Sequence, residues 1–502
     1  METLHSLVFG FEHALTLQNL MYCAIGCTVG TIIGLLPGLG PLATISLLLP
    51  LTYSIDTGGA LIMLAGIYYG AQYGDSVSAI TMKMPHASSI VACIDGYAMT
   101  LKGKTGLALF TAGVSSFIGG TVAIVVLALL APALGKVALL FSPADYCALM
   151  LFGFFCVSFV TTGSLLNGLA TCLIGVLLGQ IGTDVNSGVE RYTLGLPSLA
   201  DGLDVVSVAL GAFGIAEIIK NLDAKSQISP FNGKIKLLPT WPEFKRIIPS
   251  ALRGSVAGSF MGILPGGGAS IAQFAAYAAE KKLSKYKAEI GQGAIEGVAG
   301  QAAADEAATR TSFIPLMSIG IPENGVMALM MGAFIIKGIQ PGPNMIQEHP
   351  DLFWGLIASM WVGNVFLVTL NVPLVRYWLS LFKVPYGVLY PAILFFCCIG
   401  TYSVNNNLDD IYVTAACGLG GYLLLRFGLE PAPLMLGFIL GPMLEENFRR
   451  AMILSHGSFS VFWTHPISAA LLSLIGLFIL WQLQAFARKA LKTTVQDPAG
   501  ER

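Results

Sequence analysis

Long apolar segments, joined by short polar connections, fill most of the chain. A helix that spans a bilayer needs about 20 apolar residues, and some of these segments are long enough for two helices. The pattern therefore predicts an all-α polytopic membrane protein with roughly 11–14 membrane segments. The apolar segments lie near 17–52, 59–82, 105–131, 143–160, 162–182, 204–219, 254–280, 312–337, 354–381, 386–403, 409–427, 430–444 and 466–487.

The low content of charged residues supports the same class. Only 11% of the 502 residues are charged and 55% are hydrophobic, whereas a soluble globular domain has about 25% charged residues. A soluble protein of this length would need a charged surface that this sequence does not supply. The net charge of −1 indicates neither a nucleic acid nor a polybasic surface partner. The nine cysteines form no CxxC pattern, so neither a zinc site nor a disulfide framework is expected.

The most polar connection, residues 220–253, lies near the middle of the chain. It carries seven Lys and Arg residues against two acidic residues, so the positive-inside rule predicts that it is cytoplasmic. We expect an N-terminal repeat over 1–219, this basic linker over 220–253, a C-terminal repeat with trailing transmembrane helices over 254–487, and a cytoplasmic tail over 488–502.

Two apolar segments are interrupted in the middle by the same pattern, GxLPGxG. It occurs as GLLPGLG at 34–40 and as GILPGGG at 262–268. The second segment, 254–280, has basic residues on both flanks, and a single crossing cannot begin and end on one side. Each of its arms has roughly 11–13 residues, about half a bilayer. A re-entrant helical hairpin fits these facts, and two short crossings or one kinked helix are the alternatives.

Further pairs of motifs follow the two interruptions in the same order. SAITMKMP ends at Pro85 and FIPLMSIGIP ends at Pro322, and YAMTLKGKTG at 97–106 is matched by AFIIKGIQPG at 333–342. The ordered set indicates an internal duplication. The flanks of the first interruption lack Lys and Arg, while those of the second are rich in them. This opposite bias predicts two inverted repeats, with one hairpin entering from each side.

Interrupted membrane segments at matching positions of two halves point to a transporter's binding site. Unpaired backbone is costly in lipid and is tolerated where it lines a cavity. Proline ends the incoming arm, glycine lets the chain reverse, and the outgoing arm begins with free N–H groups that suit an anion. The expected substrate-binding backbone is Pro37, Gly38, Gly40, Pro265, Gly266 and Gly268.

Hydroxyl side chains near the interruptions are the second group of candidates. Their alternative role is a hydrogen bond to the carbonyl of their own helix, which is common in membrane helices. Ser46, Ser270 and Thr44 follow the two tips, and Ser78, Thr81, Thr311 and Ser318 lie near the second pair of motifs.

Several stretches resemble the large membrane subunit of the tripartite tricarboxylate transporters, the TctA family. They include GLLPGLGPLATISLLLPLTY, GIYYGAQYGDSVSAI, GILPGGGASIAQFAAYAAEKK and LGFILGPMLEENFRRAMILSHGS. The resemblance implies a secondary transporter of elevator type in the inner (cytoplasmic) membrane, driven by a sodium or proton gradient and needing no other cofactor. It also implies a small four-helix membrane subunit and a periplasmic binding protein that delivers a carboxylate.

Two stretches depart from the family's pattern by introducing ionisable residues. YGDSVSAITMKMPH stands where the family has YGGS…LLNIPG, and QAAADEAATRTSFIPLMSIGIPE stands for PEAANNAAAGGALIPTLTLGIPG. Ionisable groups at membrane depth are costly and are functional candidates. The departures raise the possibility of a substrate other than a tricarboxylate, such as a zwitterion or another small acid. The introduced residues are Asp75, Lys83, His86, Asp305, Glu306, Arg310 and Glu323.

These residues contact the substrate, pair with one another or lie exposed in loops. Glu306 and Arg310 have the i,i+4 spacing of a helical ion pair, and Asp75 reaches Lys83 if the chain turns between them. If it is free, Arg310 suits a substrate carboxylate. Asp75 and Asp305, with the backbone of Gly267, are the candidates for the coupling ion.

Other functions remain open at this point. A channel without coupled transport and a stand-alone permease of the same fold both fit the pattern. An enzyme is not expected, because the sequence offers no nucleophile–base pair and its scattered histidines lack HExxH spacing.

Overall fold

The computed structural model describes residues 2–36, 40–83, 89–157, 165–184, 186–223, 239–264, 268–380 and 386–495. This part of the chain is almost entirely helical, as predicted for an all-α membrane protein. Three helices are long and apolar enough to cross a membrane: Leu17–Gly34, Thr105–Ala138 and Pro350–Leu374. The strands in the described part, β1 (Gly182–Thr183) and β2 (Glu190–Arg191), form one short antiparallel hairpin.

The helices of the N-terminal part precede the hairpin, and four short helical elements follow it. Before the hairpin come α1 (Glu2–Ala14), α2 (Leu17–Gly34), α3 (Pro41–Leu48), η1 (Leu49–Thr52), α4 (Thr57–Met82), α5 (Ile90–Ala92), η2 (Cys93–Tyr97), α6 (Ala98–Leu101), α7 (Thr105–Ala138), α8 (Pro143–Val157) and α9 (Leu165–Gly179). After it come η3 (Pro197–Leu199), α10 (Val205–Ala209), η4 (Leu210–Ile215) and α11 (Ala216–Asp223).

The C-terminal part begins with a long helix at Trp241. Its elements are α12 (Trp241–Met261), α13 (Gly268–Leu283), α14 (Ile295–Thr311), α15 (Phe313–Ile319), α16 (Gly325–Ile336), α17 (Met345–Glu348), α18 (Pro350–Ser380), α19 (Tyr386–Asn405), α20 (Asp409–Arg426), α21 (Ala432–Leu454), α22 (Val461–Thr464) and α23 (Pro466–Val495).

Helices α2 and α4 pack closely through glycines spaced four residues apart. A Cβ atom at Gly26, Gly30 or Gly34 of α2 would overlap the backbone of α4. Glycine is favoured in such membrane contacts because it lets two helix backbones approach. The sequence therefore encodes this pairing by keeping the contact face of α2 small.

Helices α12 and α14 pack in the same way in the C-terminal part. Gly254 and Gly258 of α12, and Gly262 directly after it, lie against the backbone of α14 at Gly300, Ala304 and Ala308. These three glycines follow Gly26, Gly30 and Gly34 by 228 positions each, the same spacing that separates the two GxLPGxG patterns. Each interrupted segment thus begins with a helix whose contact face carries glycines. Helix α2 packs through this face on α4, and α12 packs through it on α14.

Helix α12 begins inside the segment predicted as a linker. The Thr240 N–H donates to the Glu243 carboxylate at 2.7 Å, and Pro242 lies in the first turn, where its missing N–H costs little. The two helices flanking the second interruption have 21 and 16 residues, about 31 and 24 Å long. Helix α12 is longer than its predicted arm because it begins within the linker, and α13 is longer because it continues through Lys281 and Lys282 to Leu283.

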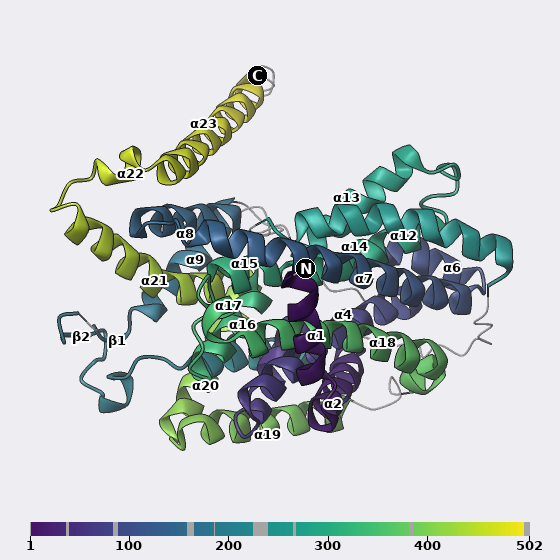
Figure 1. Cartoon of the computed structure of the whole chain (residues 1–502), viewed down its shortest axis with the longest axis horizontal. Helices are drawn as coiled ribbons and strands as arrows, with labels where there is room; N and C mark the ends of the chain where they lie inside the picture. The colour runs from purple at the N-terminus through teal and green to yellow at the C-terminus, as the bar shows by residue number, and fades with distance from the viewer. Residues whose placement is uncertain are drawn as a thin grey trace, which may run out of the picture.

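The long helix α7 of the N-terminal part packs on the C-terminal pair α12 and α14, and α18 packs on the N-terminal pair α2 and α4. Figure 1 shows α7 lying between the α12–α14 group and the group formed by α2, α4 and α18. The two parts are therefore interleaved rather than placed side by side as separate domains.

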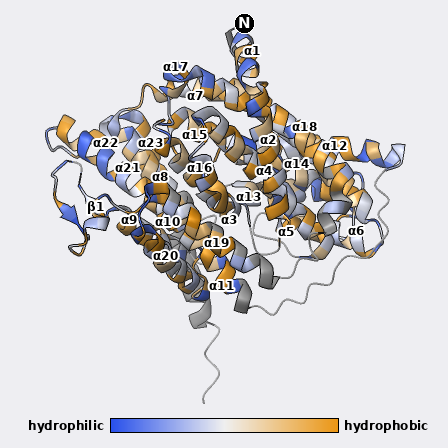
Figure 2. Ribbon diagram, turned by 90° about the horizontal axis from the view of Figure 1, so that it is seen from below, coloured by the Kyte–Doolittle hydropathy of each residue, from blue (hydrophilic) through white to orange (hydrophobic). Residues whose placement is uncertain are grey.

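The remaining helices form a second group beside this interleaved core. Helix α21 packs on α8 and α9, and α20 packs on α10, η4 and α11. Helix α23 packs on α8 and extends from there to the C-terminus (Figure 1). Figure 2 shows apolar residues along most helices and places the β-hairpin at the edge. Large apolar side chains on the outside, including Leu129, Leu173 and Phe395, are more than half exposed, as expected for surfaces that face lipid.

Candidate substrate and ion site between α4, α13 and α14

The N-terminus of α13 holds a carboxylate from elsewhere in the chain. The N–H of Gly268, the first residue of α13, donates to Oε1 of Glu323 at 2.5 Å. Glu323 lies in the connection between α15 and α16 and is 2% exposed. The Asn324 amide donates to its other oxygen at 2.7 Å. The predicted anion-binding position at the second tip is thus occupied by an acidic side chain of the protein itself.

The structure describes only part of the predicted tips. Gly268 has a φ of +43°, in the region that favours glycine, and Ser270 is half-buried in the first turn of α13. At the first tip, Gly40 precedes α3, which begins at Pro41. Six of the predicted residues lie outside the described residues: Pro37, Gly38, His86, Pro265, Gly266 and Gly267.

A buried carboxyl group lies where α4, α13 and α14 meet. Asp305 of α14 is 1% exposed and accepts a hydrogen bond at 2.5 Å from the amide of Gln72 on α4. The amide of Gln273 on α13 also bonds to it. Asp75, one turn beyond Gln72, is fully buried and is close enough to interact electrostatically with Asp305. The structure thus brings together the two acids predicted to hold the coupling ion.

Polar side chains connect this acidic centre to the tip of α13. Tyr68 lies one turn before Gln72 on α4, and its hydroxyl is hydrogen-bonded to Thr309 and Asn324. Tyr68 is also near both Glu323 and Asp305. A continuous set of buried polar residues therefore runs from the N-terminus of α13 to the middle of α4.

The predicted ion pair between Glu306 and Arg310 is confirmed, and both residues are fully buried. Arg310 also donates to Asn364 Oδ1 on α18 at 3.0 Å, and its guanidinium lies 4.6 Å from the ring centre of Tyr69. A Cβ atom at Gly120 of α7 would lie 2.7 Å from Arg310 Cζ. The guanidinium is therefore directed between α7 and α18 by several partners.

Six of the seven predicted hydroxyl groups donate to carbonyl oxygens of their own helices, the alternative role that the sequence left open. Such a hydroxyl still has lone pairs with which to accept from a ligand or bind a cation. The donor–acceptor pairs are Thr44 to Gly40 at 3.0 Å, Ser46 to Leu42 at 2.8 Å, Ser78 to Asp75 at 2.8 Å, Thr81 to Val77 at 2.7 Å, Thr311 to Ala307 at 3.0 Å and Ser318 to Ile314.

Lys83 ends α4 in the left-handed conformation, with a φ of 57°. It is exposed, and its Nζ lies 5.9 Å from the ring centre of Tyr97.

Sequence reasoning missed the uncharged members of this site. Tyr68 and Gln72 share one face of α4 with Asp75, at the i, i+4 and i+7 positions of a helix. That spacing was a usable signal. Gln273, Asn324 and Asn364 reach the site from other parts of the chain, and no local pattern links them to it.

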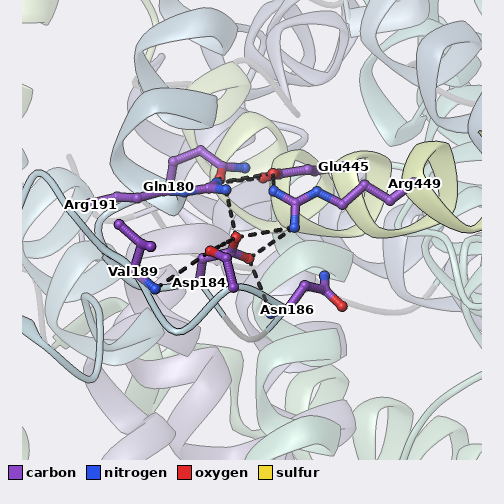
Figure 3. Close-up of polar contacts among 8 residues, drawn as sticks. Gln180, Asp184, Asn186, Val189, Arg191, Glu445 and Arg449 are labelled. Carbon is purple, nitrogen blue, oxygen red and sulfur yellow. Dashed lines mark hydrogen bonds and ion pairs between the residues drawn. The ribbon is translucent and has the colours of Figure 1, made fainter.

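A second polar cluster ties the β-hairpin to the C-terminal half of α21. Arg191 of β2 pairs with Asp184 at 2.8 Å and with Glu445 of α21 at 2.9 Å. Arg449 of α21 pairs with the same two carboxylates. Figure 3 shows the two guanidinium groups and two carboxylates facing one another, with Gln180 beside them. The alternation of charge fixes the hairpin on the helix.

We predict that attachment of this hairpin weakens only in acid. The pKa of Asp184 is lowered from its ordinary value of 3.8 to about 2, first by the Ser187 hydroxyl and also by Arg449 and Arg191. A carboxylate whose pKa is lowered by folding stabilises the folded state above its unfolded pKa. The amide protection factors of residues 186–191, which are the ratios of intrinsic to observed exchange rates, should therefore be constant above about pH 4 and fall as the pH falls toward 2.

The matching substitution tests the same contact near neutral pH. Asp184→Asn should expose the bond after Arg191 to trypsin, whereas Asp201→Asn, an exposed position in the same connection, should not. Equal cleavage of the two variants would show that the ion pairs do not hold the hairpin.

Comparisons with known proteins agree with the sequence motifs. The chain is 49% identical to an uncharacterized 52.8 kDa protein in the TAR-I ttuC' 3' region of Agrobacterium vitis, over 477 residues that cover 94% of this chain and 95% of that protein. It is 58% identical to an uncharacterized protein in the TAR-II ttuC' 3' region of the same organism, over 43% of this chain and 90% of that protein.

A more distant relative is an uncharacterized protein of Methanocaldococcus jannaschii, 25% identical over 49% of this chain and 58% of that protein. No solved structure matches the chain. The profile of the tripartite tricarboxylate transporter TctA family matches residues 20–436. The chain therefore belongs to the tripartite tricarboxylate transporter TctA family, a family of transporters rather than enzymes.

Proposed function

We propose that the chain is the large membrane subunit of a secondary transporter that imports a small carboxylate across the inner membrane, driven by a proton or sodium gradient. The substrate comes from a periplasmic binding protein, and a small four-helix membrane subunit completes the complex. The observation that carries this proposal is the buried set of polar residues between Gly268 and Asp75. It joins a helix N-terminus that holds a carboxylate to acids suited to a coupling ion.

The charges of this region support a role in ion coupling. The described part of this buried polar region contains four carboxyl groups and one guanidinium group. The carboxyl groups belong to Asp75, Asp305, Glu306 and Glu323, and the guanidinium group belongs to Arg310. Carboxylates are costly at membrane depth unless they are paired or neutralised. Asp305, with Asp75 beside it, is therefore suited to take up a proton or a cation. In this proposal, the backbone of Gly267 also contributes to binding of the coupling ion.

Two further observations support the inverted repeats of the proposed transporter, which we propose works as an elevator. Tyr68 and Asp305 are 237 positions apart, and so are Gln72 and Thr309. Gln72 bonds to Asp305, and Tyr68 bonds to Thr309. Equivalent residues thus make equivalent contacts across α4 and α14, as expected where a twofold axis relates two halves.

Two lysines make the second symmetric pair of contacts. Lys102 follows α6 and donates to the Gln292 carbonyl, and Lys337 follows α16 and donates to the Ile55 carbonyl. Each lysine thus reaches the connection that precedes the other half's long helix.

The basic connection 220–253 and the lysines at 281–287 favour entry of the second hairpin from the cytoplasm.

In this arrangement the substrate lies between the two tips. The backbone at 37–40 and 265–268 would bind its carboxylate groups, assisted by the hydroxyls of Ser46, Ser78, Thr81, Ser270, Thr311 and Ser318. Arg310 would act from behind this surface, because its described contacts hold it toward α7 and α18.

Thermal unfolding of the purified full-length chain tests the proposal. L-Malate, L-tartrate, citrate, aromatic acids and amino acids would be screened at several pH values, with and without sodium. A ligand at 100 times its Kd should add about 2.7 kcal/mol to the unfolding free energy and so raise the Tm. The screen is repeated with the small subunit and the binding protein present. If no acid raises the Tm under either condition, a carboxylate transporter is the wrong assignment.

A further inference from the structure

We propose that Glu323 is a built-in competitor of the substrate: its carboxylate occupies the N-terminus of α13, and an incoming carboxylate must displace it. This inference rests on the proposed function and goes beyond it, because it assigns to Glu323 the setting of carboxylate affinity. Glu323 stands where the TctA pattern that the chain otherwise resembles has glycine.

The geometry at the tip shows why a competitor belongs there. The Glu323 carboxylate meets Gly268 at the start of a 16-residue helix, where unpaired N–H groups and the helix dipole favour an anion. A Cβ atom at Gly268 would lie 3.4 Å from Glu323 Oε1. The carboxylate therefore lies directly against the helix end and fills the position that a substrate carboxylate would take.

Glu323 is not required to begin its own helix. The cap of α16 comes from the next residue, Asn324, whose side-chain oxygen accepts from the Met327 N–H at 2.9 Å. Among the described residues, the Glu323 carboxylate accepts from Gly268 and from the Asn324 amide. Its contact with α13 therefore joins two segments that are 55 positions apart, and its release leaves the α16 cap in place.

The connection that carries Glu323 is short and begins at a turn. Gly320 ends α15 with a φ of +81°, and α16 begins at Gly325. Tyr68 of α4 lies close to Glu323 and to Asp305. A carboxylate displaced from Gly268 would therefore remain beside the buried acids, where a second negative charge is costly. As long as Glu323 is ionised, the free energy of substrate binding is therefore reduced by this electrostatic cost.

Substitution of Glu323 tests this competition directly. Hydrogen bonds to charged groups contribute about 1.5–3 kcal/mol, so weakening the competitor should tighten carboxylate binding by about tenfold or more. The Kd values of L-malate, L-tartrate and citrate would be measured by calorimetry on the full chain. The proteins are the wild type, Glu323→Gln and Glu323→Gly, with Glu348→Gln as a matched control at an exposed glutamate on α17.

The expected result is tighter binding of at least one acid by Glu323→Gln and Glu323→Gly, and no change in Glu348→Gln. The glycine variant keeps the test valid if the glutamine variant does not fold. If the wild type binds an acid and both variants bind it equally or more weakly, the competitor is refuted while the proposed function stands. Weaker binding would make Glu323 a direct substrate ligand. If no protein in the set binds any acid, either alone or with the small subunit and the binding protein present, the proposed function fails and the competitor fails with it.

Discussion

Replacement of Arg310 by methionine is expected to lower the free energy of unfolding by about 3–5 kcal/mol, because it leaves the Glu306 carboxylate buried without its partner. Both side chains of the pair are fully buried, and one oxygen of Glu306 has no hydrogen-bond partner among the described residues. The change also removes the hydrogen bond to Asn364. Reversible unfolding in mixed detergent micelles measures the effect.

The chain offers a matched control for this substitution. Glu446 and Arg450 form an ion pair with the same i,i+4 spacing, but their side chains are 52% and 62% exposed. Arg450→Met should therefore change the unfolding free energy by less than about 1 kcal/mol. The double variant Glu306→Leu/Arg310→Met removes both buried charges and should recover most of the loss. If Arg310→Met and Arg450→Met lower the unfolding free energy equally, burial does not make the Glu306–Arg310 pair more important for stability than the exposed pair.

Asp305→Asn is expected to abolish ion-driven accumulation while leaving substrate exchange. An amide cannot release a proton and is a poorer cation ligand than a carboxylate. One coupled charge at a membrane potential of 100 mV provides about 2.3 kcal/mol, so its loss should lower the accumulation ratio about 50-fold. Uptake and counterflow of a labelled substrate in proteoliposomes of the complete transporter, with imposed proton or sodium gradients, measure the two activities separately.

A buried aspartate outside the site is the control for this experiment. Asp145 is 2% exposed and accepts hydrogen bonds from the Ser142 hydroxyl at 2.7 Å and the Ser468 N–H at 2.8 Å. Asp145→Asn should keep coupled uptake in the folded fraction. Wild-type accumulation by Asp305→Asn would remove this residue from the coupling mechanism.

Local spacing made several features predictable from the sequence. The Glu306–Arg310 pair was predicted because the helical repeat places residues four apart on one face. The two GxLPGxG interruptions were recognisable because Pro and Gly in an apolar segment require buried or cavity-lining backbone. The membrane class followed from the scarcity of charge, and the family followed from motifs spread over most of the chain.

The start of α12 shows what the same reasoning did not foresee. A polar, basic segment was assigned to a linker, but the bond between Thr240 and Glu243 begins a helix there. Polarity indicates contact with water and does not exclude a helix. The capping residues were the better local signal.

By itself, the sequence determined the membrane class, the two interruptions and the local ion pair, because the first depends on composition and the others on residues within a few turns of one another. Only the tertiary structure decided that Gln72 meets Asp305 across 233 positions and that Glu323 fills the N-terminus of α13. In lipid, apolar residues that face other helices resemble those that face the bilayer. The hydrophobic pattern therefore locates the helices but does not specify which polar residues they bring together.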